Sequence, residues 1–154
     1  MRTNKDSSAS DETKKRTSYD EIEVGTEFTS KEWVITPEQV DYFCEGNEDY
    51  HEWYSLDSPF GGRIAPPLIN YRPARDLFSA RYTVRGLLAE YESDYINPVK
   101  PNKKMVVAGK ITGKWMKRDK AFVEYEVTCV DEDGLEIFRT KRVHLLDRES
   151  TTTS

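Results

Sequence analysis

The sequence has little of what marks several large classes of protein. Its 154 residues include only two cysteines, Cys44 and Cys129, whereas a disulfide framework or a zinc site needs more ligands at closer spacing. No apolar run approaches membrane-spanning length, and the first residues contain no apolar signal-peptide segment. We therefore expect a soluble, cytoplasmic protein without a metal or other cofactor, in which both thiols stay reduced and buried.

Positive charge is also in short supply. The chain has 23 Lys and Arg against 28 Asp and Glu, a formal net charge of -5. A nucleic-acid-binding domain needs a basic stripe or patch, and here acids interrupt most of the basic clusters. Neither nucleic acid nor a membrane is an expected partner.

Large apolar side chains are nearly absent from both ends. Residues 1–17 and 149–154 consist almost entirely of polar and charged types, so nothing there offsets the entropy of ordering the chain. We expect both segments to be disordered tails. The intervening residues 18–148 are enough for one domain with a single core.

The first half of that domain predicts a strand and then a helix. β-Branched and aromatic residues alternate roughly over 27–36, as in a strand. Thr36, Pro37 and Gln39 then form a helix start signal, with a hydroxyl cap, a proline at the first position and a glutamine three residues after the cap. Gly46 is expected to end this helix.

A second helix and a set of strands make up the rest. The helix is expected to begin near Pro67, although Pro73 should kink it or mark a false start. From Leu88 onward the apolar period is two, which indicates an antiparallel meander with one buried face. We expect Phe138, His144 and Leu146 on the outward face. The residues expected to face the core are Met105, Val107, Ile111 and Trp115; Ala121, Val123, Tyr125, Val127 and Cys129; and Leu135, Ile137, Val143 and Leu145.

The order strand, helix, long connection, helix and about four strands is typical of the α+β class. It predicts an antiparallel sheet of about five strands wrapped round the second helix. Such a sheet has exposed edges, and Phe138 and Leu146 on the outward face would form a second dry surface. We therefore expect at least a dimer.

The long connection, "NEDYHEWYSLDSPFGGRIAPP", is the segment with the most chemistry. Connections of this length are usually functional or disordered, and this one is too rich in aromatics to be disordered. His51 is its best candidate for proton transfer, because an imidazole titrates near neutral pH. The alternative is a loop histidine hydrogen-bonded to a neighbour. Asp49 is expected either to orient His51 or to cap a turn.

Several of these segments resemble the MaoC-like hydratase/dehydratase family, which has the hotdog fold. The resemblance covers about 19–146 and rests on "YDEIEVGTEF", "TPEQVDYFCEGN", "SPFGGRIAPP" and "YINPVKPNKKM". The run "FGGRIAPP" is the most specific. It resembles the branch that includes fatty-acid-synthase-type dehydratase domains and the non-catalytic subunits of heterodimeric dehydratases. The resemblance implies an acyl thioester of coenzyme A or acyl-carrier protein as partner, and addition or removal of water at a 2-enoyl group.

Family members use an Asp and, five positions later, a His on this loop. Here the Asp position falls on Asn47 and the His position on Glu52, and neither can do the family's work unchanged. We therefore expect His51, a titratable imidazole flanked by acids on the same loop, to be the proton-transfer residue, with Asp49 as its orienting or co-catalytic partner. Asn47 would hold the substrate or a water where the family's acid stands.

The resemblance also implies contacts with the thioester. Tyr54 is expected to line the acyl tunnel or the dimer interface, and Arg63 to hold a phosphate of the carrier or to pair with a nearby acid. A backbone N–H near the start of the central helix polarises the thioester carbonyl in the family. Prolines have no N–H. With Pro66 and Pro67 at this helix start, the donor must come from Gly62, Ile64, Ala65 or Leu68.

Three functions fit these residues. The first is an acyl-thioester hydratase or dehydratase working by acid–base chemistry in a specialised pathway. The second is a non-catalytic hotdog subunit that shapes the acyl tunnel of a catalytic partner, so the expected assembly is a homodimer or a heterodimer of hotdog chains. The third is a hotdog thioesterase or isomerase, because this fold carries several reactions.

Overall fold

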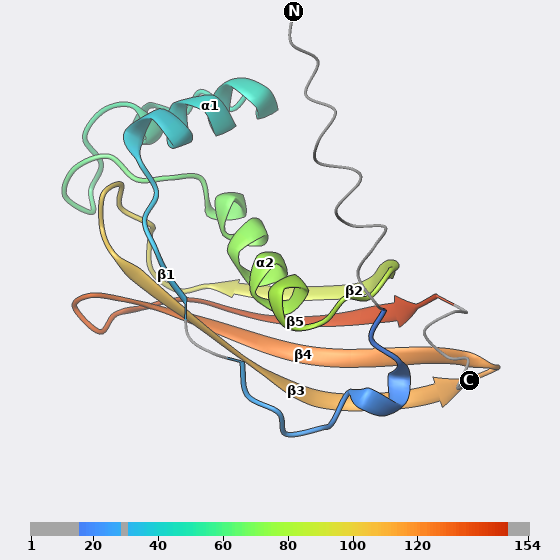
Figure 1. The fold of residues 1–154 in the computed structure, drawn as a ribbon. Helices are drawn as coiled ribbons and strands as arrows, with labels where there is room; N and C mark the ends of the chain where they lie inside the picture. The colour runs from blue at the N-terminus through green and yellow to red at the C-terminus, as the bar shows by residue number, and fades with distance from the viewer. Residues whose placement is uncertain (1–15, 29–30, 148–154) are drawn as a thin grey trace, which may run out of the picture.

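The computed structural model describes residues 16–28 and 31–147. Five strands form one antiparallel sheet in the order β1-β3-β4-β5-β2, and helix α2 lies across one of its faces (Figure 1). The expected α+β class, with an antiparallel sheet wrapped round a central helix, is confirmed. The elements are β1 (Lys31–Trp33), α1 (Pro37–Asn47), α2 (Tyr71–Arg81), β2 (Gly86–Tyr95), β3 (Met105–Lys117), β4 (Lys120–Asp131) and β5 (Glu136–Leu146).

Helix α1 begins as the sequence predicts and ends later. The Thr36 hydroxyl accepts the N–H of Gln39 at 3.2 Å, and the Gln39 side chain accepts the N–H of Thr36 at 2.9 Å. The expected end at Gly46 is wrong. The helix continues to Asn47, and Glu48 takes the left-handed conformation at φ 53°. The Glu48 N–H binds the carbonyls of Cys44 and Glu45, which closes the last turn without a glycine.

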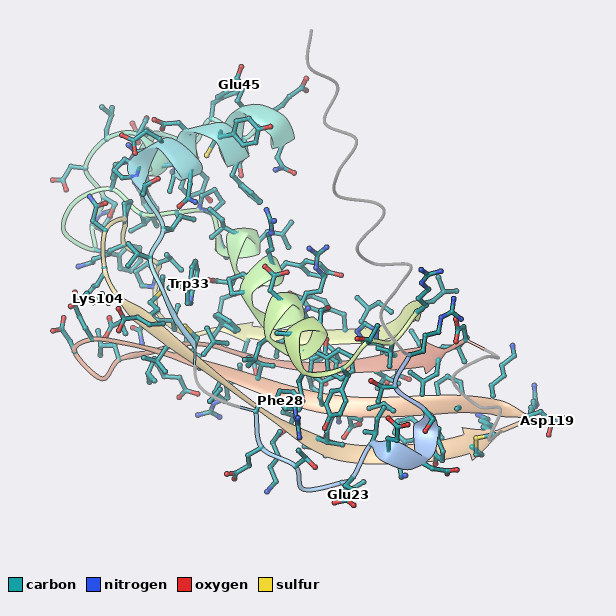
Figure 2. All side chains as sticks on the ribbon, viewed as in Figure 1. Glu23, Phe28, Trp33, Glu45, Lys104 and Asp119 are labelled. Carbon is teal, nitrogen blue, oxygen red and sulfur yellow. The ribbon has the colours of Figure 1, made fainter. Side chains whose placement is uncertain are left out.

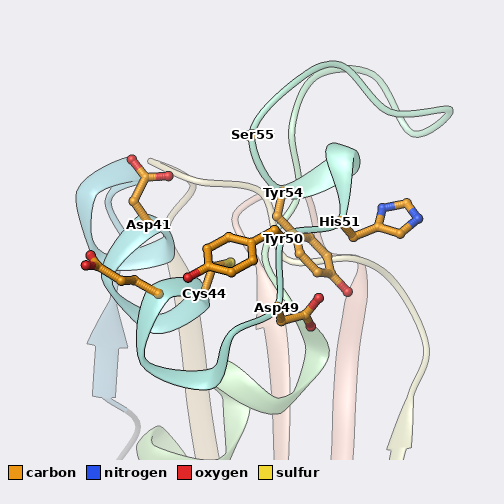
Figure 3. A pocket seen from close by; sticks show the side chains of 8 residues that line it. Asp41, Cys44, Asp49, Tyr50, His51, Tyr54 and Ser55 are labelled. Atoms are coloured by element: carbon orange, nitrogen blue, oxygen red, sulfur yellow. The ribbon is translucent and has the colours of Figure 1, made fainter.

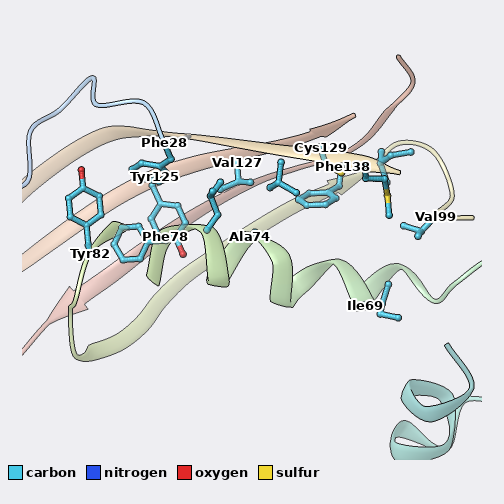
Figure 4. Packing of buried hydrophobic residues seen from close by; sticks show 14 of the residues in the cluster. Phe28, Ile69, Ala74, Phe78, Tyr82, Val99, Tyr125, Val127, Cys129 and Phe138 are labelled. Atoms are coloured by element: carbon cyan, nitrogen blue, oxygen red, sulfur yellow. The ribbon is translucent and has the colours of Figure 1, made fainter. Parts of the chain in front are cut away.

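Helix α2 is the central element of the core. The α-helix is unbroken through Pro73, because this proline falls in the first turn, where its missing N–H is not needed. The preceding residues form a 3-10 turn, η3 (Pro67–Asn70). Figure 4 shows Ala74 and Phe78 directed from α2 into the apolar cluster on the sheet, where Phe78 stacks on Tyr125 with ring centres 4.1 Å apart.

The inward face of β4 is confirmed, whereas that of β5 is inverted. Phe138 pairs with Cys129, and His144 pairs with Val123, so Phe138, His144 and Leu146 share the inner face. Phe138 and Leu146 are buried, and Leu135 is half exposed. A register shift between Cys129 and Val130 leaves Ile137 unpaired, and one extra residue moves every later side chain to the opposite face. Of the predicted inward set, Ile137 is buried in the core cluster, Val143 and Leu145 lie on the outer face, and Leu135 precedes the strand. The prediction is therefore correct for Ile137 and wrong for the other three.

A second bulge reverses the end of β3. The register shifts between Ile111 and Gly113, so Trp115 pairs with Phe122 on the outer face. The two rings stack at 5.7 Å. Trp115 was expected to share the face of Met105, and this prediction is wrong for the same physical reason.

The ends of the domain meet beside the sheet. Arg16 forms an ion pair with Asp147 at 2.7 Å, and the Thr17 N–H binds the Thr83 carbonyl at 2.9 Å. The last two residues of the expected N-terminal tail thus contact the domain, and the rest of both tails lies outside the described residues. Among the described residues of the expected strand 27–36, β1 forms a ladder with β3, and Glu27 forms an isolated bridge with Lys110.

Helix α1 and the connection after it lie at one end of the molecule. The tip of the β3–β4 hairpin at Asp119 lies at the opposite end from Glu45 on α1 (Figure 2). Within residues 16–28 and 31–147, no helix has the length and hydropathy needed to cross a bilayer.

Candidate functional site

A hollow of about 380 Å³ lies between α1 and the 3-10 turn η2 (Glu52–Tyr54) (Figure 3). Of the predicted site residues, His51, Asp49 and Tyr54 line it. Asn47, Gly62, Arg63 and Ile64 are not among the lining residues, which are Asp41, Cys44, Glu45, Asp49, Tyr50, His51, Tyr54 and Ser55. Three of the seven residues expected in the site therefore share one hollow.

The loop's own backbone orients His51. Its Nδ1 accepts the N–H of Trp53 at 3.2 Å and so caps η2. The imidazole meets the rings of Trp53 and Tyr54 with centres 5.0 and 5.6 Å apart. An accepting Nδ1 carries no proton, so the neutral ring has its hydrogen on Nε2. Within the described part of the chain, no hydrogen bond joins Asp49 to His51, and Figure 3 shows the imidazole directed outward.

Asp49 also lines the hollow, but it contacts α1 rather than His51. Its N–H binds the Cys44 carbonyl at 2.9 Å. Burial first, and then the negative charge of Asp49, raises the pKa of the Tyr54 phenol and the pKa of the Cys44 thiol. Both groups therefore stay protonated at neutral pH, and a thiol in this state is a poor nucleophile. The arrangement suits proton transfer rather than covalent catalysis.

Arg63 joins α1 to η2. Its Nε donates to the Tyr54 carbonyl at 2.9 Å, and its Nη2 donates to Asp41 at 2.6 Å. This is the acid pairing that the sequence left as an alternative to phosphate binding. The guanidinium thus holds the loop against α1 beside the hollow.

Of the four backbone amides expected to polarise a thioester, three have partners within the domain. The N–H of Gly62 binds Asp57 at 2.6 Å, that of Ile64 binds the Trp53 carbonyl at 2.9 Å, and that of Ala65 binds the Val99 carbonyl at 2.8 Å. The N–H of Leu68 has no hydrogen-bond partner among the residues that the structure describes. It lies in η3, directly before α2, and is the donor left for a ligand.

A turn around Asp57 and Ser58 holds the Gly-Gly pair, and sequence reasoning missed it. Asp57 accepts the N–H groups of Ser58 and Gly62, and the Ser58 hydroxyl donates to the Gly62 carbonyl at 2.6 Å. An Asp or Ser that bonds its own backbone nearby is a common turn device. The signal was present in "LDSPFGG", but the resemblance drew attention to the glycines alone.

A second polar group, also missed, lies on the inner face of the sheet. His144, which was expected to point outward, has its Nε2 3.1 Å from the Tyr125 hydroxyl and stacks on Phe78. Burial and then the charge of Arg142 lower the pKa of His144, and burial raises the pKa of Tyr125 to about 12. The inverted register of β5 is the reason that the sequence placed His144 on the wrong face.

No convergent metal-ligand group is present in the described ranges, where no three His, Cys, Asp or Glu side chains are placed to hold an ion. No family model and no curated protein matches the sequence.

Solved structures resemble this fold closely. An R-hydratase, PhaJ1 from Pseudomonas aeruginosa, is 15% identical, with 85% of this chain and 86% of that chain covered at a TM-score of 0.72. A monoamine oxidase regulatory protein from Archaeoglobus is 12% identical, with 90% and 97% covered at 0.75. The HadBC (3R-hydroxyacyl-ACP dehydratase) complex from Mycobacterium tuberculosis is 14% identical, with 79% and 96% covered at 0.67. At these identities the likeness establishes the fold, which is the hotdog fold of MaoC-like dehydratases and (R)-hydratases.

Proposed function

We propose that this hotdog chain acts on an acyl thioester of coenzyme A or acyl-carrier protein as a hydratase or dehydratase. The observation that carries the proposal is the unpaired N–H of Leu68 at the start of the central helix, close in sequence to a loop with titratable groups. In a fold shared with hydratases and dehydratases, such an amide suits the thioester carbonyl. The positive end of the helix backbone adds to this effect.

The proposed chemistry is transfer of protons around a 2-enoyl group. In hydration, the water oxygen bonds to C3, a base takes a proton from the water, and C2 receives a proton as the enolate collapses. Leu68 N–H stabilises the enolate oxygen, with His51 and Asp49 as the proton-transfer groups. For His51 to accept a proton through Nε2, Nδ1 must carry the hydrogen and give up its bond to the Trp53 N–H. The turn η2 must therefore shift when substrate binds.

The other predicted contacts belong to the same proposal. Tyr54 forms one wall of the hollow, and Gly62 and Ile64 lie in the same loop with their N–H groups bonded to Asp57 and to the Trp53 carbonyl. Arg63 positions this wall through Asp41 rather than through a carrier phosphate. Cys44 and Cys129 are both buried and unpaired, which suits the reducing cytoplasm.

A non-catalytic subunit is the second candidate, and Asn47 favours it. Its side-chain amide donates to the Phe43 carbonyl of α1 at 2.8 Å and cannot transfer a proton. With Glu52 at the family's His position, this chain would shape the acyl tunnel for a catalytic hotdog partner. Two hetero-complexes, HadBC and ChsH1–ChsH2, are among the structures with this fold.

We also propose that two hotdog chains associate along β2. This strand is an outer strand of the sheet and has exposed apolar side chains, among them Leu87 at 70% and Tyr91 at 37%. An uncovered edge of this kind pairs readily with another strand. Phe138 and Leu146 take no part, because both are in the core. Sedimentation at micromolar concentration should give a dimer for the wild type, and a charged Leu87→Lys variant should shift it toward monomer.

Turnover by the purified chain tests the function. We expect hydration of crotonyl-CoA or a longer enoyl thioester, with His51→Ala and Asp49→Asn each reducing the rate by about 10²–10⁴-fold while the fold is retained. Glu48→Gln removes an exposed carboxylate next to Asp49 and serves as the matched control. Near-wild-type rates in both variants would make His51 and Asp49 structural. Turnover that begins only when a second hotdog chain is added would establish the subunit function instead.

A further inference from the structure

Arg142 is a buried cation without an acid. Its side chain points from β5 toward the start of α2 and the residue is 1% exposed. Nη2 donates to the Tyr71 carbonyl at 2.9 Å, and the guanidinium lies over the Tyr71 and Tyr91 rings at 4.3 and 5.1 Å. Within the described residues no carboxylate pairs with Arg142, and its Nε has no hydrogen-bond partner. The Tyr71 carbonyl and the two ring faces compensate the charge only in part, and the positive end of α2 does not compensate it.

The half of the inner face around Arg142 is polar. The Ser93 hydroxyl donates to Thr140 at 2.8 Å, and the Tyr91 and Tyr95 hydroxyls are 2.8 Å apart. The other half, on β3 and β4, is apolar and covered by α2. Tyr91 and Tyr95 are 37% and 40% exposed on β2, so the polar half lies beside the strand along which we propose that two chains associate. A plain hydrocarbon chain placed here would leave the Arg142 Nε–H without a partner.

The position of Arg142 relative to Leu68 sets the length of a matching ligand. Tyr71, whose carbonyl binds Arg142, follows Leu68 by three residues, which is roughly 5 Å along a helix axis. A group held at the Leu68 N–H by its thioester carbonyl thus reaches the guanidinium with an acyl chain of only a few carbons. Asn70, between them, is also buried with an unpartnered Oδ1, and its amide can rotate to present a donor.

We propose that Arg142 is a specificity-determining residue that binds a carboxylate at the far end of a short acyl group, so that the preferred substrates are dicarboxylic acyl thioesters. This inference rests on the proposed function, since it names the substrate class for the same site. A guanidinium matches a carboxylate in charge and geometry, and the free Nε–H supplies a donor that no described residue uses.

Equilibrium binding separates this inference from turnover. We would measure the affinity of the purified chain for glutaryl-CoA and for pentanoyl-CoA, which have the same number of acyl carbons and differ in the terminal carboxylate. Glutaryl-CoA should bind roughly 10- to 100-fold more tightly, the gain of one charge-assisted hydrogen-bonded pair. Arg142→Met should bring the ratio to about one, and Arg142→Lys should retain part of it. Arg139→Met, which removes an exposed arginine from the outer face of the same strand, should leave the ratio unchanged.

The possible results test the role of Arg142 separately from the proposed function. Equal affinity of the wild type for the two thioesters, with hydration of crotonyl-CoA intact, would overturn the role of Arg142 and leave the proposed function standing. A ratio retained in a folded Arg142→Met would do the same. Equal affinity together with a change in sedimentation of Arg142→Met would assign the missing counter-charge to a second chain. Should Arg142→Met not fold by circular dichroism, the wild-type ratio and Arg142→Lys still decide. Failure of both thioesters to bind, as coenzyme A or pantetheine esters, would overturn the proposed function as well.

Discussion

The two histidines lie in regions that are held together by different interactions. His51 is exposed on the loop between α1 and α2, where its ring caps a short turn. His144 lies under α2, stacked on Phe78 and bonded to Tyr125. Hydrogen bonds from Asp57, Ser58 and Arg63 hold the loop, whereas close packing holds the core around His144.

This difference in the interactions indicates that the loop around His51 can rearrange, whereas the core around His144 cannot. A loop held by single hydrogen bonds can rearrange at small cost, as proton transfer by His51 requires. The core can rearrange only by losing packed apolar contacts. Substitutions in the two regions should therefore differ in their effect on the free energy of unfolding, and the following experiments test that difference.

Truncation of the central ring should have the largest effect. Phe78 is 1% exposed and contacts Phe28, Tyr82, Tyr125 and His144. Phe78→Ala should reduce the free energy of unfolding by about 3–5 kcal/mol, from lost burial and the cavity left behind. Urea denaturation measures the change. A loss below ~1 kcal/mol would mean that the core around α2 is loosely packed.

Overfilling the core should cost somewhat less. A Cβ added at Gly109 on β3 would overlap the Phe28 ring and come within 3.3 Å of Leu77. Gly109→Ala should therefore destabilise the domain by about 1–3 kcal/mol. Gly46→Ala is the matched control, because a Cβ there meets no atom within 4 Å, and it should be neutral or slightly stabilising. Thermal unfolding of the two variants would show whether the space between α2 and β3 is filled.

The pH dependence of stability should depend on His144. Its pKa is lowered in the folded chain, so as the pH falls below its ordinary value the unfolded chain takes up a proton that the folded chain does not. Stability should fall with decreasing pH over that range, with this residue contributing a slope of at most about 1.4 kcal/mol per pH unit. His144→Gln should remove this contribution from urea denaturation curves recorded at about pH 7.5 and 5.5, which are roughly the ends of the range in which histidine titrates. An unchanged difference would place the titrating group elsewhere.

A substitution in the loop should have the smallest effect. Ser58 donates to the Gly62 carbonyl at 2.6 Å and accepts the Phe60 N–H at 3.2 Å. Ser58→Ala should cost about 1 kcal/mol, because the neighbouring backbone groups can turn to water. Amide exchange at Phe60 should rise more than exchange in β4. A loss as large as that of Phe78→Ala would mean that the loop is part of the core.

Local patterns predicted the elements better than the faces. The capping box of Thr36 and Gln39 is a contact between neighbours and was read correctly. The start of the central helix and the alternation on β4 also followed from short-range pattern. The side of the sheet on which His144 lies depended on one extra residue at Ile137. In "IFRTKRVHLL" both the odd and the even positions contain apolar residues, so either set could face the core. Sequence periodicity could not decide between them.

For the candidate site, the sequence identified the loop, whereas tertiary contacts determined which of the loop's residues lie together in the hollow. His51, Asp49 and Tyr54 come together because α1 ends at Asn47 and the chain turns back over it. The partner of Arg63 is Asp41, on the preceding helix, and no local pattern predicts that pair. The free amide at Leu68 was one of four candidates, and hydrogen bonds to Asp57, Trp53 and Val99 removed the other three.

The sequence by itself determined the order of elements, the α+β class and the position of the long loop, because caps, prolines and apolar periods act over a few residues. The tertiary structure alone decided that β5 turns Arg142 and His144 inward beneath α2. The bulge at Ile137 sets that orientation, and the position of a bulge depends on which strands pair rather than on the residues within one strand. A buried cation without an acid is therefore visible only in the folded chain.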